Sequence, residues 1–484
     1  MTRRPAGFWF AALLIFANFG AGQANEQRPN ILFLTADDLR PELGCYGAAH
    51  VHSPNLDALA VRGIRFDRAY CQKAVCWPSR NSFFSGLRPN DLGKANAKHT
   101  FRESHPDLIS LPQLFKQHGY MTRGFGKILH DGQNDPDSWT EPHFFPEKKI
   151  YAAPENAGKL PVINRSSPEN RENPLFESAE VPDEAYEDGL TVRAAIAAIE
   201  EATSGSQKDD PFFFMVGFHK PHTPFNAPQR YWNLYRRDHL PLAPFREAPT
   251  GAPSEYALLD WPYVRSFRDM PIDGPMPDDL ALEVRHAYYA CVSYVDALVG
   301  QVIRAVNRSS AADNTLIVFT SDHGYHLGDH GTWSKHTNFE IATRVPLLIA
   351  MPESQENASR GVSIGAPVEL LDLYPTLAEI ANLPLPDHVE PDSFASWLTT
   401  PESVPDESFA FSEFTRKGAR GVSVRSPEFR YTEWRNLETG QRVAQELYDH
   451  RTDPLETRNV VKAPENQSVV SQLTDQIAPH FQKD

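Results

Sequence analysis

The sequence predicts an α/β fold in which a mainly parallel sheet lies between helices. Short apolar runs at residues 30–35, 211–217, 315–320 and 347–350 are typical of buried strands. Amphipathic helical patterns lie between these runs, and the longest covers residues 279–306. Strands that alternate with helices favour a parallel sheet covered on both faces, because each crossover places a helix on the sheet.

Three helical patterns follow one another along the chain. Residues 55–61 form a short one, residues 184–202 are rich in alanine, and the pattern at 279–306 carries a continuous apolar stripe. Two segments between the predicted elements, 131–180 and 221–278, are dense in proline, asparagine, glutamate and aromatic residues. Long loops of this kind either shape a binding site or only cover the surface.

The N-terminus is typical of a secretory signal peptide, which we expect to span residues 1–24. Arg3 and Arg4 give it a charged start, residues 8–16 form its apolar core, and residues 22–24 offer small side chains for cleavage. The apolar core is too short to cross a bilayer, and no later segment has the pattern of a membrane span. We therefore expect a secreted or periplasmic protein with no membrane span.

The mature chain is predicted to have two parts. Residues 25–400 are expected to form a large N-terminal domain, and residues 401–484 a small C-terminal α+β subdomain. A change of composition near residues 386–408 is typical of a linker. Short alternating strands and a terminal helix are predicted after it, at residues 408–414, 421–424, 430–434 and 467–481.

Charge and cysteine content limit the possible partners. The chain has 47 Lys and Arg against 63 Asp and Glu, a net charge of −16, which argues against nucleic acid as a partner. A site for anions must therefore be local. The four cysteines are too few for a disulfide framework in a chain of 484 residues, and a bridge between Cys45 and Cys71 is left open.

The most informative motif is Cys-Trp-Pro-Ser-Arg at residues 76–80. Pro78 suits the first turn of a helix, and Gly86 is a plausible end to it. Cys76 would then lie at a helix N-terminus, where free N–H groups favour an oxyanion. Arg80 follows one turn later on the same face and can stabilise such a charge. The alternative is a buried structural cysteine beside a helix start.

Two acidic motifs directly follow predicted strands. Asp37 and Asp38 come after the first strand, and Asp322 and His323 come after the strand at 315–320. In open α/β sheets, ligands bind beyond the carboxyl ends of the strands. Converging carboxylates need a cation, and an oxygen-rich set favours Ca²⁺ or Mg²⁺ over Zn²⁺. The alternative is that Asp38 and Asp322 only cap helices.

Together these motifs resemble the type I sulfatase family, in which the motif cysteine is oxidised to formylglycine before folding is complete. The resemblance continues in chain order through residues 53–57, Gly126-Lys127, His219 and Lys335. Within the family, blocks such as residues 217–225 are most similar to the iduronate-2-sulfatase subgroup. The resemblance implies an alkaline-phosphatase-like fold with a catalytic N-terminal domain. It also implies a single Ca²⁺ whose ligands come from Asp37, Asp38, Asp322, His323 and the formylglycine at position 76.

The resemblance further implies a sulfuric ester hydrolase that removes sulfate from a sulfated glycan, with a 2-O-sulfated uronic acid as the expected target. A formylglycine-generating or other sulfatase-maturing enzyme would be a partner. A hydroxyl of the hydrated aldehyde is expected to attack the sulfur, with Asp322 taking its proton. Arg80, Lys127 and Lys335 would neutralise the sulfate oxygens. His219, assisted by Lys335, would protonate the departing sugar oxygen, and His130 would act as the base that releases sulfate.

Four further residues are expected to recognise the sugar or a carboxylate, namely Lys220, His222, Tyr325 and His336. Two positions depart from the family pattern. Tyr325 stands where close relatives usually carry Trp, and Trp77 stands where a smaller residue is usual.

Two other functions are left open by the sequence. A phosphatase or phosphonate hydrolase of the same superfamily is disfavoured by the complete cysteine motif and the Asp-rich set for one metal. A catalytically inactive, calcium-dependent glycan-binding protein is disfavoured because binding alone would need neither Cys76 nor His130.

Overall fold

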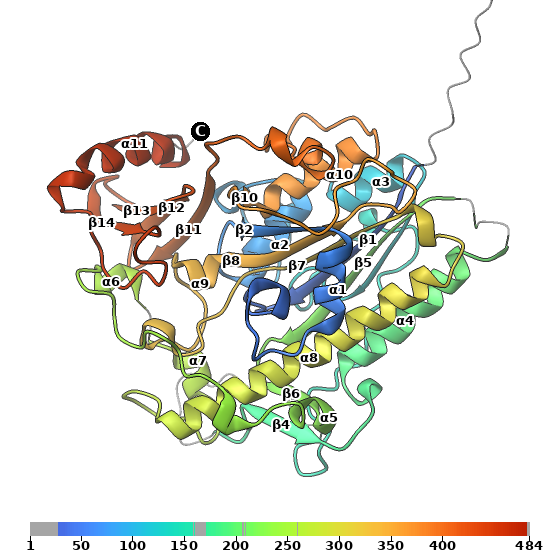
Figure 1. The fold of residues 1–484 in the computed structure, drawn as a ribbon, viewed down its shortest axis with the longest axis horizontal. Coiled ribbons are helices and arrows are strands. Elements are labelled where there is room, and N and C mark those ends of the chain that lie inside the picture. The colour runs from blue at the N-terminus through green and yellow to red at the C-terminus, as the bar shows by residue number, and fades with distance from the viewer. Residues whose placement is uncertain are drawn as a thin grey trace, which may run out of the picture.

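The computed structural model describes residues 28–157, 159, 171–205, 208, 210–258 and 260–481. The predicted signal peptide at residues 1–24 lies outside the described residues. Two sheets side by side, a large central one and a smaller C-terminal one, organise the chain (Figure 1).

The central sheet has eight strands in the order β10-β2-β8-β7-β1-β5-β3, with β9 beside β2. Strand β1 pairs in parallel with β5 and β7, so that Ile31 lies opposite Phe213 and Leu316. These strands are β1 (Asn30–Asp37), β2 (Ile64–Tyr70), β3 (Met121–Gly126), β5 (Phe212–Pro221), β7 (Thr315–Ser321), β8 (Arg344–Ala350), β9 (Val362–Ile364) and β10 (Val368–Glu369).

The prediction of a mainly parallel sheet is confirmed, with one exception. Strand β8 runs antiparallel to both of its neighbours, β7 and β2. Between β7 and β8 the chain forms no helix longer than the single turn α9 (Glu340–Thr343). A parallel pair needs a long crossover, usually a helix, and without one the chain returns in the opposite direction.

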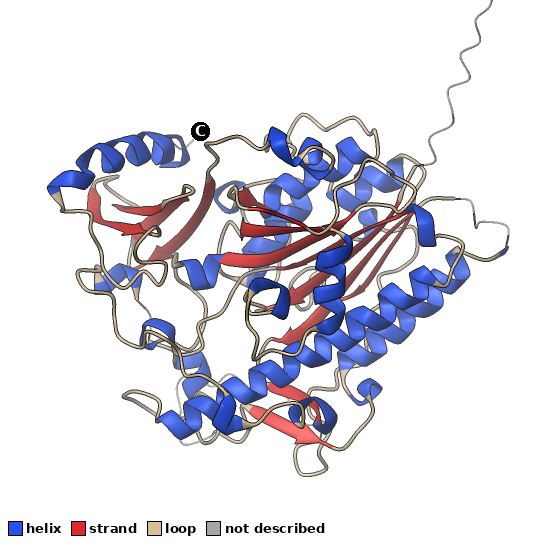
Figure 2. Cartoon of the chain, in the orientation of Figure 1, coloured by secondary structure: helices blue, strands red, loops and turns tan. Residues whose placement is uncertain are grey.

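Helices cover both faces of the central sheet (Figures 1 and 2). Because successive side chains of a strand point to opposite faces, Leu32 and Leu34 pack under one helical layer, and Ile31 and Phe33 under the other. The first layer comprises α1 (Pro54–Arg62), α4 (Glu187–Ala202) and α8 (Asp278–Asn307), and the second comprises α2 (Cys76–Ser85), α3 (Leu111–Gln117) and α10 (Leu373–Ile380).

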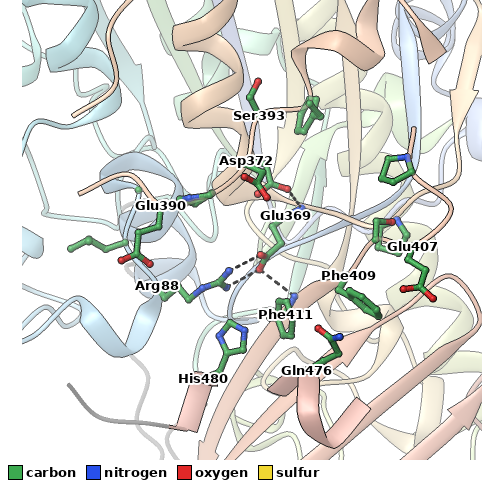
Figure 3. Close-up of a pocket in the computed structure, with 18 of the residues that line it drawn as sticks. Arg88, Glu369, Asp372, Glu390, Ser393, Glu407, Phe409, Phe411, Gln476 and His480 are labelled. Carbon is green, nitrogen blue, oxygen red and sulfur yellow. Dashed lines mark hydrogen bonds and ion pairs between the residues drawn. The ribbon is translucent and has the colours of Figure 1, made fainter. Parts of the chain in front are cut away.

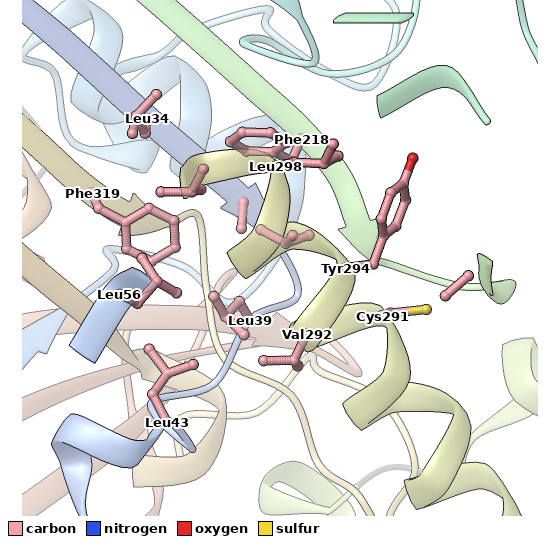
Figure 4. Packing of buried hydrophobic residues seen from close by; sticks show 14 of the residues in the cluster. Leu34, Leu39, Leu43, Leu56, Phe218, Cys291, Val292, Tyr294, Leu298 and Phe319 are labelled. Carbon is pink, nitrogen blue, oxygen red and sulfur yellow. The ribbon is translucent and has the colours of Figure 1, made fainter. Parts of the chain in front are cut away.

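Helix α8 is the longest packing element of the first layer. Its Val292 and Leu298 lie in the same apolar cluster as Leu34, Leu56 and Phe319 (Figure 4). The helix has the length and hydropathy of a membrane span, but 78% of its apolar window is buried inside the fold. This is the environment of a core helix in a globular protein.

The two loop-rich segments meet in a small parallel sheet formed by β4 (Phe176–Ala179) and β6 (Phe225–Pro228). The second segment also contains the one-turn helices α5 (Gln229–Trp232), α6 (Ser254–Ala257) and α7 (Pro262–Arg265). The described parts of both segments therefore pack together in the fold.

The C-terminal sheet is antiparallel and has four strands, one more than the sequence predicts. Helix α11 (Gln467–Ile477) packs Leu473 and Ile477 against Val424 and Leu447 of this sheet. The strands are β11 (Ala410–Arg416), β12 (Ala419–Arg425), β13 (Phe429–Asn436) and β14 (Arg442–Asp449).

Candidate active site

Helix α2 begins at Cys76 and ends before Gly86, as the sequence predicts. Gly86 adopts φ 80° and closes the helix with a hydrogen bond from its N–H to the carbonyl of Ser82. Cys76 is only 4% exposed, and burial together with the nearby Asp37 raises the pKa of its thiol well above the ordinary value. The four cysteines are free, so Cys45 and Cys71 do not form a bridge.

Three charged or titratable side chains surround the sulfur of Cys76. Its Sγ lies 3.1 Å from Nζ of Lys335, 3.4 Å from Oδ1 of Asp37 and 3.4 Å from Nε2 of His323. These partners come from segments far apart in the sequence. The N-terminus of α2 is therefore a point where the loops beyond β1 and β7 converge.

The acidic residues meet because their strands are adjacent. Ala36 and Ser321 lie opposite each other in the β1–β7 pair, so Asp37 and Asp322 leave the sheet at the same level. Asp38 follows with φ 66°, and its N–H donates to Oδ1 of Asp322 over 3.1 Å. Each of the three carboxylates is at most 1% exposed.

This group has the chemistry of a cation site. Ligand atoms of Asp37, Cys76, Asp322 and His323 all lie within 4.8 Å of one another. Among the described residues, Oδ2 of Asp38 is buried and accepts no hydrogen bond. Nε2 of His222 lies 3.9 Å from this oxygen, which is too far for a hydrogen bond. An orphaned carboxylate oxygen beside other carboxylates fits a hard cation such as Ca²⁺ or Mg²⁺.

Two lysines neutralise part of this negative charge. Nζ of Lys127 lies 2.5 Å from Oδ2 of Asp37, and Nζ of Lys335 lies 2.5 Å from Oδ1 of Asp38. Burial raises the pKa of Asp37, but Lys127 and the other cations outweigh it and hold this pKa well below the ordinary range. Burial, Asp37 and Asp322 raise the pKa of Asp38 to about 8 despite Lys335.

The guanidinium of Arg80 is surrounded by acceptors from the protein. Its guanidinium is fully buried, and Nε donates to Oδ2 of Asp322 over 2.9 Å. Nη1 donates to the carbonyls of Lys127 and Ile128, and Nη2 donates to the carbonyl of Ala36. In this structure Arg80 therefore holds the cation ligands and the Lys127 loop, and its donors are directed at the protein instead of at a sulfate.

Four of the predicted histidines lie beside these groups, and a lowered pKa keeps each of them uncharged at neutral pH. Burial, with a smaller contribution from Lys127, lowers the pKa of His130 to about 4, and burial lowers that of His323 to about 4. Burial also holds the pKa values of His219 and His222 well below the ordinary value, and their rings stand edge to face 5.1 Å apart. Among the described residues, Nδ1 of His130 is buried without a hydrogen-bond partner.

Two of the predicted sugar-binding residues face the protein interior. The ammonium group of Lys220 donates to the carbonyls of His222 and Pro224, so it fixes its own loop. Tyr325 is 2% exposed, and its ring stacks on that of Tyr288 at an interplanar angle of 20°. The structure does not support a sugar-binding role for Lys220 or Tyr325, because neither side chain is open to a ligand.

The other two lie nearer to open surface. His222 is partly exposed beside Asp38, and its Nδ1 faces the carbonyl of Thr223. His336 is half-buried with φ 72°, and its ring lies 6.0 Å from that of Phe414 in the C-terminal sheet. His336 thus brings this sheet to the edge of the site.

Two acidic residues beside the site were not predicted from the sequence. Asp131 lies 3.7 Å from Nζ of Lys127, and Oε1 of Glu187 lies 3.3 Å from Nδ1 of His219. Asp131 directly follows His130, so its position was a usable signal. Glu187 is one of several acidic residues at the start of an amphipathic helix, and nothing in the sequence distinguishes it.

Of two cavities in the described structure, one is lined by predicted site residues and the other is not. One of about 250 Å³ is lined by Lys127, His130, Asp131, Glu187 and His219 among others, and adjoins the predicted catalytic groups. Another, of about 770 Å³, lies between the C-terminal sheet and the end of α2 (Figure 3). Its lining includes the ion pair of Arg88 with Glu369 but none of the predicted site residues.

Solved structures show which fold this is. A protein in complex with its substrate D-glucosamine-2-N,6-O-disulfate matches with a TM-score of 0.72 at 21% identity, over 94% of this chain and 98% of that chain. The phosphonate monoester hydrolase of Agrobacterium radiobacter matches with a TM-score of 0.73 at 22% identity, over 93% and 95% of the two chains. With the family match below, these neighbours confirm the predicted alkaline-phosphatase-like fold.

Sequence comparison identifies the family to which the chain belongs. Iduronate 2-sulfatase of Mus musculus is 33% identical over 506 residues, which cover 89% of this chain and 90% of the relative. The family model described as N-sulphoglucosamine sulphohydrolase, C-terminal, matches residues 328–483. The model described as Sulfatase matches residues 29–383, the part that contains the whole cluster around Cys76, and the chain therefore belongs to the sulfatase family of sulfuric ester hydrolases.

Proposed function

We propose that this sulfatase removes sulfate from a glycan whose sulfated unit is a 2-O-sulfated uronic acid, using formylglycine at position 76 and Ca²⁺. The observation that carries the proposal is the environment of Cys76. Its sulfur lies at a helix N-terminus within 3.4 Å of Lys335, Asp37 and His323. The uronic acid assignment is supported by the similarity to iduronate 2-sulfatase.

The residues around position 76 fit both a hydrated aldehyde and a divalent cation. Asp37, Asp38, Asp322 and His323 would hold the cation, and the orphaned Oδ2 of Asp38 is an available ligand atom. When present, the hydrated aldehyde would supply the attacking hydroxyl, and Ca²⁺ would make that hydroxyl more acidic.

The protein's own groups divide the remaining work. Lys127 and Lys335 stay protonated and would offset the charge of the sulfate oxygens. Oδ1 of Asp37 is the carboxylate oxygen in contact with residue 76, whereas both oxygens of Asp322 already accept hydrogen bonds. Because Lys127 and other cations hold the pKa of Asp37 well below the ordinary range, Asp322 remains the residue proposed to accept the first proton. His130 is neutral with a free Nδ1, which suits the base that completes sulfate release.

The test is sulfate release from a panel of disaccharides that carry 2-O-sulfated uronates or 6-O-sulfated hexosamines. Wild-type protein and Cys76→Ala are produced together with a formylglycine-generating enzyme, and the mass of the peptide around residue 76 is measured. We expect release from the 2-O-sulfated uronates only, and loss of at least about 1,000-fold in the variant.

The other outcomes correct different parts of the proposal. Release from hexosamine sulfates alone would reject the uronate assignment and keep the chemistry. No sulfate release from any substrate by a chain with confirmed formylglycine, together with turnover of a phosphonate ester, would reject the sulfatase mechanism proposed for this site.

A further inference from the structure

Glu187 and His219 form a buried pair between two elements of the fold. Nδ1 of His219, near the end of β5, lies 3.3 Å from Oε1 of Glu187, in the first turn of α4. The side chain of Glu187 is 10% exposed and that of His219 is 15% exposed. At this ion-pair distance and burial, the carboxyl group lies close enough to Nδ1 to favour one orientation of the imidazole ring.

The backbone around this pair is fixed by the neighbouring residue. Oδ1 and Oδ2 of Asp188 accept hydrogen bonds from the N–H groups of His219 and Lys220, over 2.7 and 2.9 Å. The same turn of α4 is packed closely, since a side chain on Gly189 would lie 2.2 Å from the carbonyl of Asp183. Glu187 therefore has little freedom to leave His219.

The charges that face the pair decide where its proton lies. The positive charges of Lys127 and Lys220 act on His219. The carboxylate of Asp131 lies 4.0 Å from Nδ1 of His219. Burial, with Asp188 adding to it, raises the pKa of Glu187 to about 7, while burial and Lys127 lower the pKa of His219. At neutral pH the carboxyl group of Glu187 is therefore about half protonated, and the imidazole of His219 is neutral.

Solvent can reach this pair through a cavity. The cavity of about 250 Å³ that it lines extends to Lys148 and Asp131, whose side chains are 59% and 37% exposed. His222, whose ring stands 5.1 Å from that of His219, separates the pair from Asp38.

We propose that Glu187 is a positioning residue that directs Nε2 of His219 at the departing sugar oxygen and supplies its proton through the ring. This inference rests on the proposed function. As the S–O bond breaks, its electron pair goes to the sugar oxygen, which takes the proton from Nε2. The carboxyl proton of Glu187 passes to Nδ1, and the resulting carboxylate regains a proton from water in the cavity.

The test uses the dependence of the rate on the leaving group. A sugar alcohol is a poor leaving group and needs a proton, whereas 4-nitrophenolate leaves without one. We expect Glu187→Gln to lower kcat by at least about 10-fold on the sulfated disaccharide that the wild type cleaves fastest, and by less than about 2-fold on 4-nitrophenyl sulfate. His219→Ala should show the same selectivity, and Glu187→Gln should add no further loss to it.

Matched variants separate positioning from folding. Glu200→Gln removes an exposed carboxylate from the same helix and should leave both rates unchanged. Glu187→Asp, which keeps the carboxyl group, should recover part of the disaccharide rate. Equal losses on both substrates, or additive losses in the double variant, would overturn the proposal. If wild-type protein with formylglycine releases sulfate from neither substrate, the proposed function itself fails and this role fails with it.

Discussion

The guanidinium of Arg80 has partners on three segments of the chain. It binds Asp322 beyond β7, the carbonyl of Ala36 in β1 and the carbonyls of the loop after β3. Planar guanidinium groups are suited to such fixed, multiple acceptors, and a lysine ammonium group is not. At the scale of a single residue, Arg80 determines how the strand ends are spaced around the cation site.

A lysine at position 80 should therefore affect stability as well as activity. Arg80→Lys leaves at least two buried acceptors without a donor, and we expect it to lower the free energy of unfolding by about 3 kcal/mol. Urea denaturation followed by fluorescence measures this change. Arg451→Lys, at an exposed ion pair, is the control and should change stability by less than about 0.5 kcal/mol. Lost activity with unchanged stability would instead support the predicted contact of Arg80 with sulfate.

Among the elements, the end of β3 depends on a single glycine. Gly126 adopts φ 70°, and a Cβ there would lie 2.3 Å from the carbonyl of Gly217 in β5. The next residue is Lys127, whose N–H bonds to that same carbonyl over 2.9 Å. The close approach of two strands thus places the ammonium group of Lys127 beside Asp37.

We expect Gly126→Ala to destabilise the protein by more than about 2 kcal/mol, because it combines a left-handed conformation with a backbone clash. It should also lower kcat more than about 10-fold, since Lys127 moves away from the sulfate-binding groups. Gly440→Ala is the control, because Gly440 also has a positive φ but has no atom within 4 Å of the added Cβ. Thermal unfolding and kcat of both variants test this, and equal effects would contradict the role of the close approach.

The elements also show why part of this structure could be predicted and part could not. Strands β1, β5 and β7 are continuous apolar runs because both of their faces are buried. Such runs can be recognised in the sequence. Strand β2 contains Arg65, Asp67 and Arg68, and β3 contains Arg123 and two glycines, so no apolar run marks them. Strand β14 begins with Arg442 and Gln445 within a largely exposed stretch and was missed for the same reason.

The site divides in a similar way. Asp37 and Asp322 could be placed together because both follow predicted strands, whereas Cys76 was placed beside them only by the resemblance to the sulfatase family. The interior positions of Lys220 and Tyr325 depend on how long loops pack, and Glu187 depends on the contact between α4 and β5. Such distant contacts leave no local pattern in the sequence.

Across the whole molecule, the C-terminal sheet contacts two segments that lie near predicted site residues. Strand β11 bonds to the chain just before Cys76, through Ser412 to the carbonyl of Cys71. Arg430 of β13 is 1% exposed and pairs with Glu340, five residues after Lys335, and with Glu456, over 2.5 and 2.7 Å. The carboxylates of Glu340 and Glu456 are therefore paired with arginine and need no metal ion to neutralise them.

Breaking this network should weaken both sheets at once. We expect Arg430→Met to lower the free energy of unfolding by about 3 kcal/mol, because Glu340 and Glu456 remain buried with less positive charge nearby. It should also reduce kcat through movement of the Lys335 loop. Arg451→Met, which removes an exposed arginine of the same sheet region, should leave both quantities unchanged. A variant at Arg430 that loses stability but keeps its full kcat would show that the sheet does not position Lys335.

The burial of Cys76 has a consequence for how active protein is obtained. Its thiol is 4% exposed, carries a raised pKa and lies beneath loops contributed by residues up to position 335. An oxidising enzyme can reach such a side chain only while those later segments have not yet closed over it. Under the proposed function, activation and folding therefore compete in time during each round of synthesis. We then expect a chain that folds first to stay inactive however long it is stored with a modifying enzyme, so that the specific activity of a preparation would measure the outcome of that competition.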